Sequence, residues 1–143
     1  MLNKLKRAAL GAHTPHDKAT AASKPVPMPL PAQVRILMSQ HIGAPAKTLV
    51  KKGDEVFVGT KIGEASGNVS ANIHSSVSGT VTAVETFRLA DGHMCDSVVI
   101  QTDGNQTKDP NLAPPTVTDK ASFLAAVRES GLVGLGGAGF PTD

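Results

Sequence analysis

Short runs of apolar and β-branched residues, interrupted by turn residues, dominate the chain between residues 34 and 101. Apolar side chains alternate with other residues in several of these runs, as they do in strands that bury one face. Gly53-Asp54 and Ser78-Gly79 separate neighbouring runs and are typical of turns. The pattern predicts six strands, at residues 34–38, 47–52, 56–58, 61–64, 79–84 and 97–101. We therefore expect a small, mainly β unit.

Three segments between these strands are predicted to lack regular structure. Residues 39–46 form a connector in which Pro45 removes a backbone donor. Residues 67–76 are small and polar, as in a loop or a hairpin crossing. Residues 91–93, Asp-Gly-His, are typical of a hairpin tip.

The pattern changes after Ile100, where a turn and a proline-containing linker lead to a single predicted helix. Thr118 is the expected N-cap and Asp119 adds negative charge to the first turn. Gly131 stands where a left-handed C-cap belongs. The helix has one apolar face and is expected to dock on another part of the protein; that face is formed by Phe123, Leu124 and Val127.

The chain opens with a basic arm that ends in alternating prolines at positions 25, 27, 29 and 31. Alternating prolines favour an extended polyproline strap. We expect four parts: a basic, proline-rich arm (1–31), a β domain (32–103), a linker (104–117), and a helix with a glycine-rich loop (118–143).

Composition narrows the possible functions. The chain has four Phe and no Trp or Tyr, so it lacks the aromatic platforms that single-stranded nucleic acids stack on. Its single cysteine, Cys95, excludes an internal disulfide framework and a cysteine-rich metal or iron–sulfur site within these residues. No apolar run approaches the roughly 20 residues that span a bilayer. The net charge of +2 is concentrated in the first 30 residues, and a solvated tail is the expected role for them.

The order of motifs between residues 49 and 84 resembles the barrel-sandwich hybrid of biotinyl and lipoyl carrier domains. The resemblance rests on Val50-Lys51-Lys52-Gly53-Asp54, Ile62-Gly63-Glu64-Ala65 and Ser78-Gly79-Thr80-Val81. In such carriers a lysine at the hairpin tip takes the cofactor. Here the tip is Ser66-Gly67-Asn68, and no lysine occurs between Lys61 and Lys108. The resemblance implies the carrier fold without the carrier chemistry.

Residues 134–142, Gly-Leu-Gly-Gly-Ala-Gly-Phe-Pro-Thr, are the most specific segment. Glycine-rich loops allow backbone N–H groups to approach phosphate oxygens. The string resembles the flavin- and NADH-binding loop of the flavoprotein subunit of respiratory complex I. The resemblance implies a flavin or nicotinamide site lined by Gly134, Gly136, Gly137, Ala138, Gly139 and Phe140.

A barrel-sandwich domain placed before such a loop resembles the C subunit of Rnf electron-transport complexes. The resemblance covers nearly the whole chain, including residues 39–47 and a looser match at residues 11–15. It implies a peripheral subunit on the cytoplasmic side of a bacterial membrane, with NADH, ferredoxin and the other Rnf subunits as partners. It also implies FMN and 4Fe-4S clusters in the full-length subunit. We expect the chain to be the amino-terminal portion of such a subunit, redox-inert alone and without a stably bound cofactor.

No catalytic residue and no metal site are assigned. His13 and His16 flank Pro15 and lack a third ligand, so they make a poor metal site. His41 and His74 are expected to be hydrogen-bonded structural residues, and Cys95 is expected to pack in the core.

Two alternatives remain open. One is a biotinyl- or lipoyl-fold carrier-like protein without the modified lysine. The other is a free-standing adaptor that binds a partner through its basic tail and proline strap. A true biotinyl or lipoyl carrier would require a modified lysine at the hairpin, and a gene that ends at residue 143 would support the adaptor.

Overall fold

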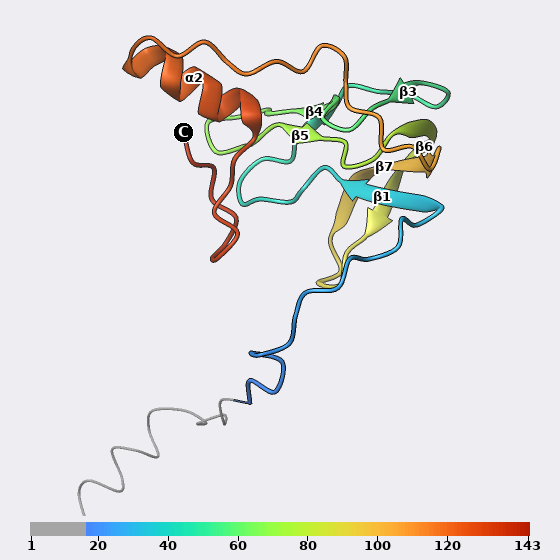
Figure 1. The fold of residues 1–143 in the computed structure, drawn as a ribbon. Coiled ribbons are helices and arrows are strands. Elements are labelled where there is room, and N and C mark those ends of the chain that lie inside the picture. The colour runs from blue at the N-terminus through green and yellow to red at the C-terminus, as the bar shows by residue number, and fades with distance from the viewer. Residues whose placement is uncertain (1–16) are drawn as a thin grey trace, which may run out of the picture.

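The computed structural model describes residues 17–143, and the predictions for residues 1–16, including those for His13 and His16, lie outside the described residues. Seven strands and one helix follow each other along these residues. Residues 17–32 contain no strand or helix, and Figure 1 shows that the earlier part of this segment runs away from the folded body, whereas Pro31 and Ala32 accept hydrogen bonds from Thr102 of β7. The proline strap, residues 25–31, thus contains neither helix nor strand.

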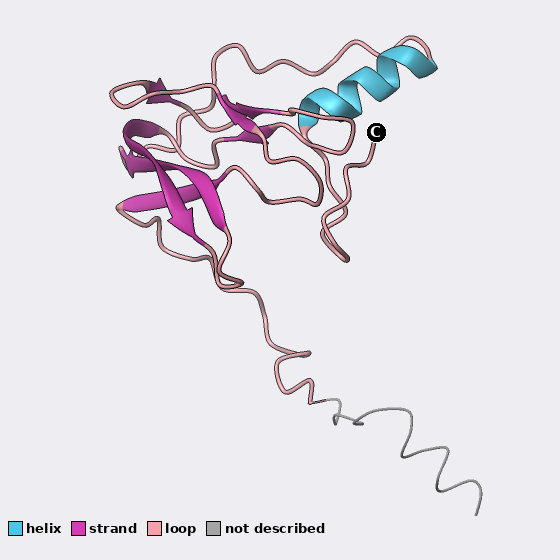
Figure 2. Cartoon of the chain, turned by 180° about the vertical axis from the view of Figure 1, so that it is seen from behind, coloured by secondary structure: helices cyan, strands magenta, loops and turns pink. Residues whose placement is uncertain are grey.

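The strands form two antiparallel sheets. The first has the order β1-β7-β6-β3, and its strands are β1 (Gln33–Leu37), β7 (Met94–Thr102), β6 (Gly79–Arg88) and β3 (Glu55–Val56). The second has the order β2-β4-β5, and its strands are β2 (Lys47–Thr48), β4 (Lys61–Glu64) and β5 (Ile73–His74). Figure 2 shows the strands gathered on one side and the helix α2 (Lys120–Ser130) on the other.

The core lies between the sheets and consists of aliphatic side chains, one thioether and one thiol. Its buried members are Ile36, Met38, Ala46, Val56, Ile62, Ile73, Val77, Val81, Cys95, Val98 and Ile100. Both sheets contribute to this set, so the two sheets close on each other as one apolar unit. The mainly β class predicted from the sequence is confirmed.

Most strand positions agree with the sequence pattern, although the strands predicted at 47–52 and 56–58 are only the two-residue strands β2 and β3. Residues 61–64 form β4 as predicted, and the strands predicted at 79–84 and 97–101 are longer in the structure. The tip at residues 91–93 is confirmed, because the N–H of Leu89 donates to the carbonyl oxygen of His93 at 2.8 Å. The prediction of a loop through residues 67–76 is wrong in part, because it contains β5. A two-residue strand is too short to produce a detectable alternation.

The two sheets and the core between them form the barrel. The segment that follows β7 returns to this barrel. The N–H of Val58 donates to the carbonyl oxygen of Thr107 at 2.9 Å, and the N–H of Asp109 donates to that of Val58 at 2.9 Å. The Thr60 hydroxyl donates to the Asp109 carboxylate at 2.6 Å. Residues 107–109 are thus fixed to the edge of the barrel before the chain reaches α2.

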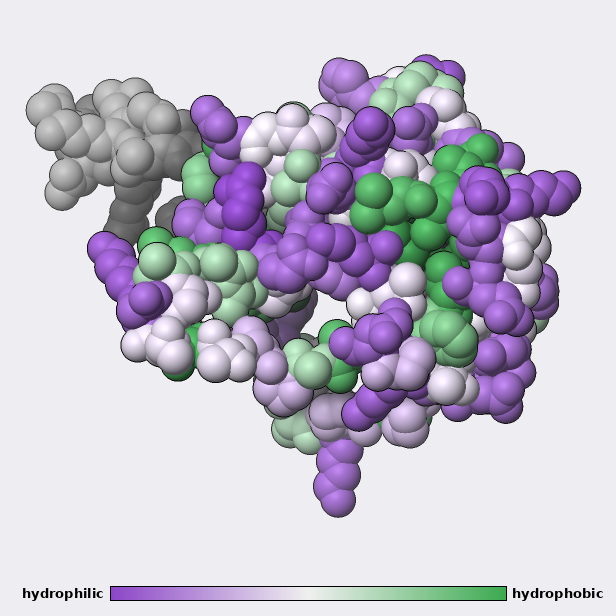
Figure 3. Space-filling model, turned by 90° about the horizontal axis from the view of Figure 1, so that it is seen from above, coloured by the Kyte–Doolittle hydropathy of each residue, from purple (hydrophilic) through white to green (hydrophobic). Residues whose placement is uncertain are grey.

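The surface differs from region to region. Seen from above, most of it mixes hydrophilic and hydrophobic residues, and one hydrophobic patch lies in the right half (Figure 3). Several large apolar side chains of the C-terminal quarter are among the exposed ones: Leu112, Val117, Phe123, Leu124, Leu132, Leu135 and Phe140.

Candidate functional site

The glycine-rich loop, residues 134–140, turns back on itself. Val133 and Pro141 form an antiparallel bridge at its base. The N–H of Gly134 donates to the carbonyl oxygen of Phe140 at 2.9 Å, while the N–H groups of Gly137 and Gly139 both donate to that of Gly134 at 3.2 Å. Three of its four glycine amides are therefore used within the loop.

The glycines of the loop differ in why they are needed. Gly139 has a φ of 69° and is buried against the connector, where an added Cβ would lie 3.1 Å from the carbonyl oxygen of Gln40. At Gly136 and Gly137 an added Cβ would meet nothing within 4 Å. The fold of these residues thus requires glycine at Gly139 but gives no reason for it at Gly136 or Gly137.

An open groove of about 500 Å³ lies between the loop, the connector at residues 39–42 and the β6–β7 hairpin. Of the six residues predicted to line a cofactor site, Gly137, Ala138 and Gly139 line this groove, and Gly134, Gly136 and Phe140 do not. None of its lining residues, all within the described part of the chain, is Lys or Arg.

The charge of the groove is negative. It is lined by Asp91, which accepts a hydrogen bond from the N–H of His93 at 2.9 Å. This bond and a second one to the His93 side chain lower the pKa of Asp91 below its ordinary value of 3.8. Asp91 is therefore anionic at neutral pH, which disfavours a phosphate beside it.

Helix α2 leads into the loop. Its N-cap is Asp119 and not Thr118 as predicted, because the Asp119 carboxylate accepts the N–H of Ser122 at 2.7 Å and completes a capping box. The prediction for Gly131 is confirmed: it caps the helix in the left-handed conformation with φ 66° and ψ 31°. The Gly131 N–H donates to the carbonyl oxygen of Arg128 at 3.1 Å.

The helix docks mainly through polar groups, and of its predicted apolar face only Val127 is half-buried. Phe123 and Leu124 remain 55% and 40% exposed, and no residue of α2 is fully buried. Lys61 of β4 instead forms an ion pair with Glu129 at 2.6 Å. The Asn72 amide donates to the carbonyl oxygens of Arg128 and Glu129 at 3.5 and 3.3 Å.

The hairpin tip that carries the lysine in carrier domains is held in place here. The Ser66 hydroxyl donates to the carbonyl oxygen of Pro45 at 2.5 Å. From α2, the Arg128 guanidinium donates to the carbonyl oxygen of Gly67 at 3.3 Å and pairs with Asp143 at 2.5 Å. The tip thus contacts the helix and presents no amine.

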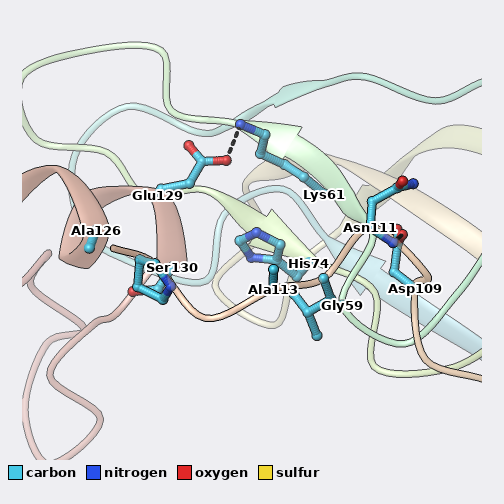
Figure 4. Close-up of a pocket in the computed structure, with 11 residues that line it drawn as sticks. Gly59, Lys61, His74, Asp109, Asn111, Ala113, Ala126, Glu129 and Ser130 are labelled. Atoms are coloured by element: carbon cyan, nitrogen blue, oxygen red, sulfur yellow. Dashed lines mark hydrogen bonds and ion pairs between the residues drawn. The ribbon is translucent and has the colours of Figure 1, made fainter. Parts of the chain in front are cut away.

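A second cavity, of about 430 Å³, lies where the barrel, the linker and α2 meet. Figure 4 shows the Lys61–Glu129 ion pair at one side and the His74 ring near the middle. Burial lowers the pKa of His74 below its ordinary value of 6.5, partly opposed by the Glu129 carboxylate and reinforced by the Lys61 ammonium. The ring therefore favours its neutral form in the folded protein.

Comparison with known proteins identifies the family. A family model described as the RnfC barrel sandwich hybrid domain matches residues 6–105. The chain belongs to the RnfC family. The predicted barrel-sandwich hybrid and the resemblance to the Rnf C subunit are thereby confirmed.

The relatives of this RnfC chain are C subunits of ion-translocating complexes. It is 46% identical over 136 residues to the one from the Na⁺-translocating ferredoxin:NAD⁺ oxidoreductase complex of Acetobacterium woodii, covering 92% of this chain and 31% of the relative. It is 37% identical to the one from the proton-translocating complex of Clostridium ljungdahlii, covering 92% and 30%. It is 38% identical to the one from the ion-translocating oxidoreductase complex of Rhodobacter capsulatus, covering 89% and 25%. The chain thus spans less than a third of the length of these relatives.

His41 and Cys95 of this RnfC domain have structural roles, whereas none is evident for His74. His41 is buried, and its ring contacts the carbonyl oxygen of Ile42 at 3.0 Å and the N–H of Ala71 at 3.2 Å, as predicted for a turn histidine. His74 lies on β5, and the expectation that its ring is hydrogen-bonded is wrong, because within residues 17–143 the ring makes no hydrogen bond. Cys95 packs in the core as predicted.

Residues 17–143 hold neither a metal-binding cluster nor a membrane-spanning helix. No group of three or more His, Cys, Asp or Glu side chains in that range is arranged to hold a metal ion. The one helix in that range is too short and too polar to cross a membrane.

Sequence reasoning missed the buried polar residues beside β5. Ser70 and Asn72 are 1% and 8% exposed, although the sequence places them in a segment predicted to be a polar loop. Their hydrogen bonds reach residues at sequence separations of 26 and 57, so no local sequence pattern indicates that these two side chains are buried.

Proposed function

We propose that this chain is the amino-terminal module of the NADH-oxidising C subunit of an Rnf-type, ion-translocating ferredoxin:NAD⁺ oxidoreductase. The observation that supports this most strongly is the match of the RnfC domain model, together with the names of the relatives. The partners are then the other subunits of the complex, with NADH and ferredoxin reached through the longer subunit. The location that follows is peripheral, on the cytoplasmic side of the membrane.

Within that subunit, we propose that the glycine-rich loop forms one wall of the FMN or nicotinamide site. Gly136 and Gly137 support this, because the described residues give neither of them a steric reason to be glycine. Glycine at an open position lets a ligand or another domain approach the backbone closely.

The loop does not supply a complete site. Three of its glycine amides are bonded internally, and Asp91 opposes a phosphate in the adjoining groove. Binding of FMN then needs cationic or N–H groups from outside the described residues. Bound FMN would accept hydride from NADH. The role proposed for this chain is to hold the backbone of the glycine-rich loop in position as one wall of that site.

The 4Fe-4S clusters of the proposed subunit are likewise not held here. Such a cluster takes four thiolates, and the chain has one cysteine, buried in the core. We therefore propose that residues 1–143 alone are redox-inert.

A titration of FMN followed by flavin fluorescence tests this proposal. The 143-residue chain is expected to show no saturable quenching, whereas the longer subunit is expected to bind FMN and to lose affinity with Gly137→Asp. This substitution adds charge at an open, exposed position, so the fold should tolerate it. Asn68→Asp, which adds the same charge at the exposed hairpin tip, is the control.

Either of two results would refute the proposal. One is saturable binding of FMN by the 143-residue chain. The other is equal FMN affinity of the Gly137→Asp and Asn68→Asp forms of the longer subunit.

The carrier alternative is less well supported. The tip residues Ser66, Gly67 and Asn68 hold no amine, and Arg128 occupies one of their carbonyl oxygens. An intact mass equal to that of the unmodified sequence would eliminate a biotinyl or lipoyl adduct.

A further inference from the structure

The segment that precedes β5 is polar in sequence and buried in the structure. Ser70, Ala71 and Asn72 are 1%, 4% and 8% exposed. The Ser70 hydroxyl accepts the N–H of Ser66 at 3.1 Å and donates to the carbonyl oxygen of Ala44 at 2.8 Å. These bonds fix the segment to the barrel, so its next two residues are held in defined positions.

Asn72 joins this segment to the end of α2. Its side-chain oxygen accepts the N–H of Ala65 at 2.9 Å, and its amide nitrogen faces the carbonyl oxygens of Arg128 and Glu129 and, at 3.1 Å, the Glu129 carboxylate. The last carbonyl groups of a helix lack partners within the helix. Asn72 thus caps the C-terminus of α2 from outside the helix.

The neighbouring Ala71 joins the segment to the far side of the glycine-rich loop. Its N–H donates to Nε2 of His41 at 3.2 Å, which leaves Nδ1 to donate to the carbonyl oxygen of Ile42 at 3.0 Å. The N–H of Ile42 in turn donates to the carbonyl oxygen of Gly139 at 3.4 Å. A chain of three contacts therefore runs from Ala71 to the loop.

We infer that residues 71–72 form a two-point mount on the barrel that sets the position of the glycine-rich loop, with Asn72 holding its helix end and Ala71, through His41, its connector end. The barrel is then a positioning element for the loop. This deepens the proposed function, because the loop is the proposed wall of the cofactor site, but the mount itself is defined without any cofactor.

The geometry favours a positioning role over general stabilisation. The bonds of Asn72 to α2 link the barrel to a helix without a buried residue. Loss of these bonds should therefore release α2 and the loop while the apolar core of the barrel remains intact.

Hydrogen exchange resolved along the 143-residue chain tests the inference with three variants. Asn72→Asp keeps the acceptor for Ala65 but replaces the donor by a carboxylate, which the helix C-terminus and Glu129 repel. His41→Phe keeps a ring of similar size without its two nitrogens. Lys61→Met removes only the ion pair with Glu129 and serves as the control.

The expected footprints differ. Asn72→Asp should speed exchange at residues 123–134 by about tenfold or more. This is the effect expected when local opening no longer has to break roughly one hydrogen bond to a charged or buried group. His41→Phe should act mainly at residues 139–142. Lys61→Met should change exchange less than about fivefold, as for a partly exposed ion pair. Amides of β4, β6 and β7 should exchange as in the parent chain in all three.

Unchanged exchange of α2 in Asn72→Asp would overturn the inference, as would faster exchange spread equally over the barrel strands in both test variants. FMN titration of the longer subunit separates this from the proposed function. If the longer subunit binds FMN, Asn72→Asp should weaken binding although the loop sequence is intact. If it binds none, the proposed function fails. The hydrogen-exchange patterns of the variants still test whether residues 71–72 position the loop.

Discussion

The barrel and the C-terminal segment, residues 118–143, are held by different kinds of interaction. The barrel closes on buried aliphatic side chains from both of its sheets. Helix α2 has no fully buried residue and meets the barrel through an ion pair and side-chain amide contacts. Burial of apolar area contributes most of the free energy of folding but has no preferred direction, whereas hydrogen bonds contribute little and fix orientation. The apolar core of the barrel thus supplies most of the stability, whereas the polar contacts of the C-terminal segment fix its position on the barrel.

The sharpest way to test this contrast is to truncate one large apolar side chain in each region. Ile62→Ala, at a fully buried position in β4, is expected to lower the free energy of unfolding by about 2–5 kcal/mol. Phe123→Ala, on the exposed face of α2, is expected to change it by less than about 0.5 kcal/mol. Urea denaturation followed by circular dichroism measures both, and similar losses in the two variants would contradict the contrast.

A smaller effect is expected at the junction of the two regions. In Gly131→Ala the new Cβ would collide with the carbonyl oxygen of Asn72, and the left-handed backbone adds about 1–2 kcal/mol. We expect α2 to separate from the barrel, seen as faster amide exchange at residues 123–142 with barrel amides unchanged.

Gly104→Ala is the matched control for that prediction. Gly104 also has a positive φ, of 79°, but an added Cβ would meet nothing within 4 Å. The strained backbone of Gly104→Ala should lower the free energy of unfolding, but hydrogen exchange at the α2 amides should not change. If both variants release α2, the close approach of Gly131 to Asn72 is not what matters.

The smallest effect concerns pH. Burial lowers the pKa of His74 below 6.5, so the unfolded chain binds more protons than the folded chain as the pH falls through that value. This difference in proton binding does not affect stability above about pH 6.5. Below that pH it progressively lowers the free energy of unfolding. Denaturation midpoints between pH 8 and pH 5 should fall toward acid, and His74→Gln should reduce the slope. Parallel profiles for the two proteins would show that His74 does not titrate as described.

The barrel could be predicted from the sequence because its physical cause is local. Alternating apolar residues and glycine turns mark β4, β6 and β7, and Gly131 marks the end of the helix. The predicted N-cap is wrong by one residue because Thr118 and Asp119 are both good caps, and only the position of Ser122 decides between them.

The site was less predictable for a physical reason. The glycine-rich string marks the loop, but which of its amides remain available depends on hydrogen bonds formed after it folds. Asn72 and His41 act on partners far away in sequence, and a polar residue in a polar segment gives no sign that it will be buried. The six predicted cofactor-binding residues remain a prediction.

The attachment of residues 107–109 to the barrel edge has a consequence for how α2 finds its place. Because these residues are bonded to Val58 and Thr60, the tether that spans to the helix begins at residue 110, not at the end of β7. A shorter tether costs less entropy to close and raises the effective concentration of the helix at its docking face, into the millimolar range for short flexible linkers. Contacts too weak to capture a free helix from solution can then keep a tethered one bound.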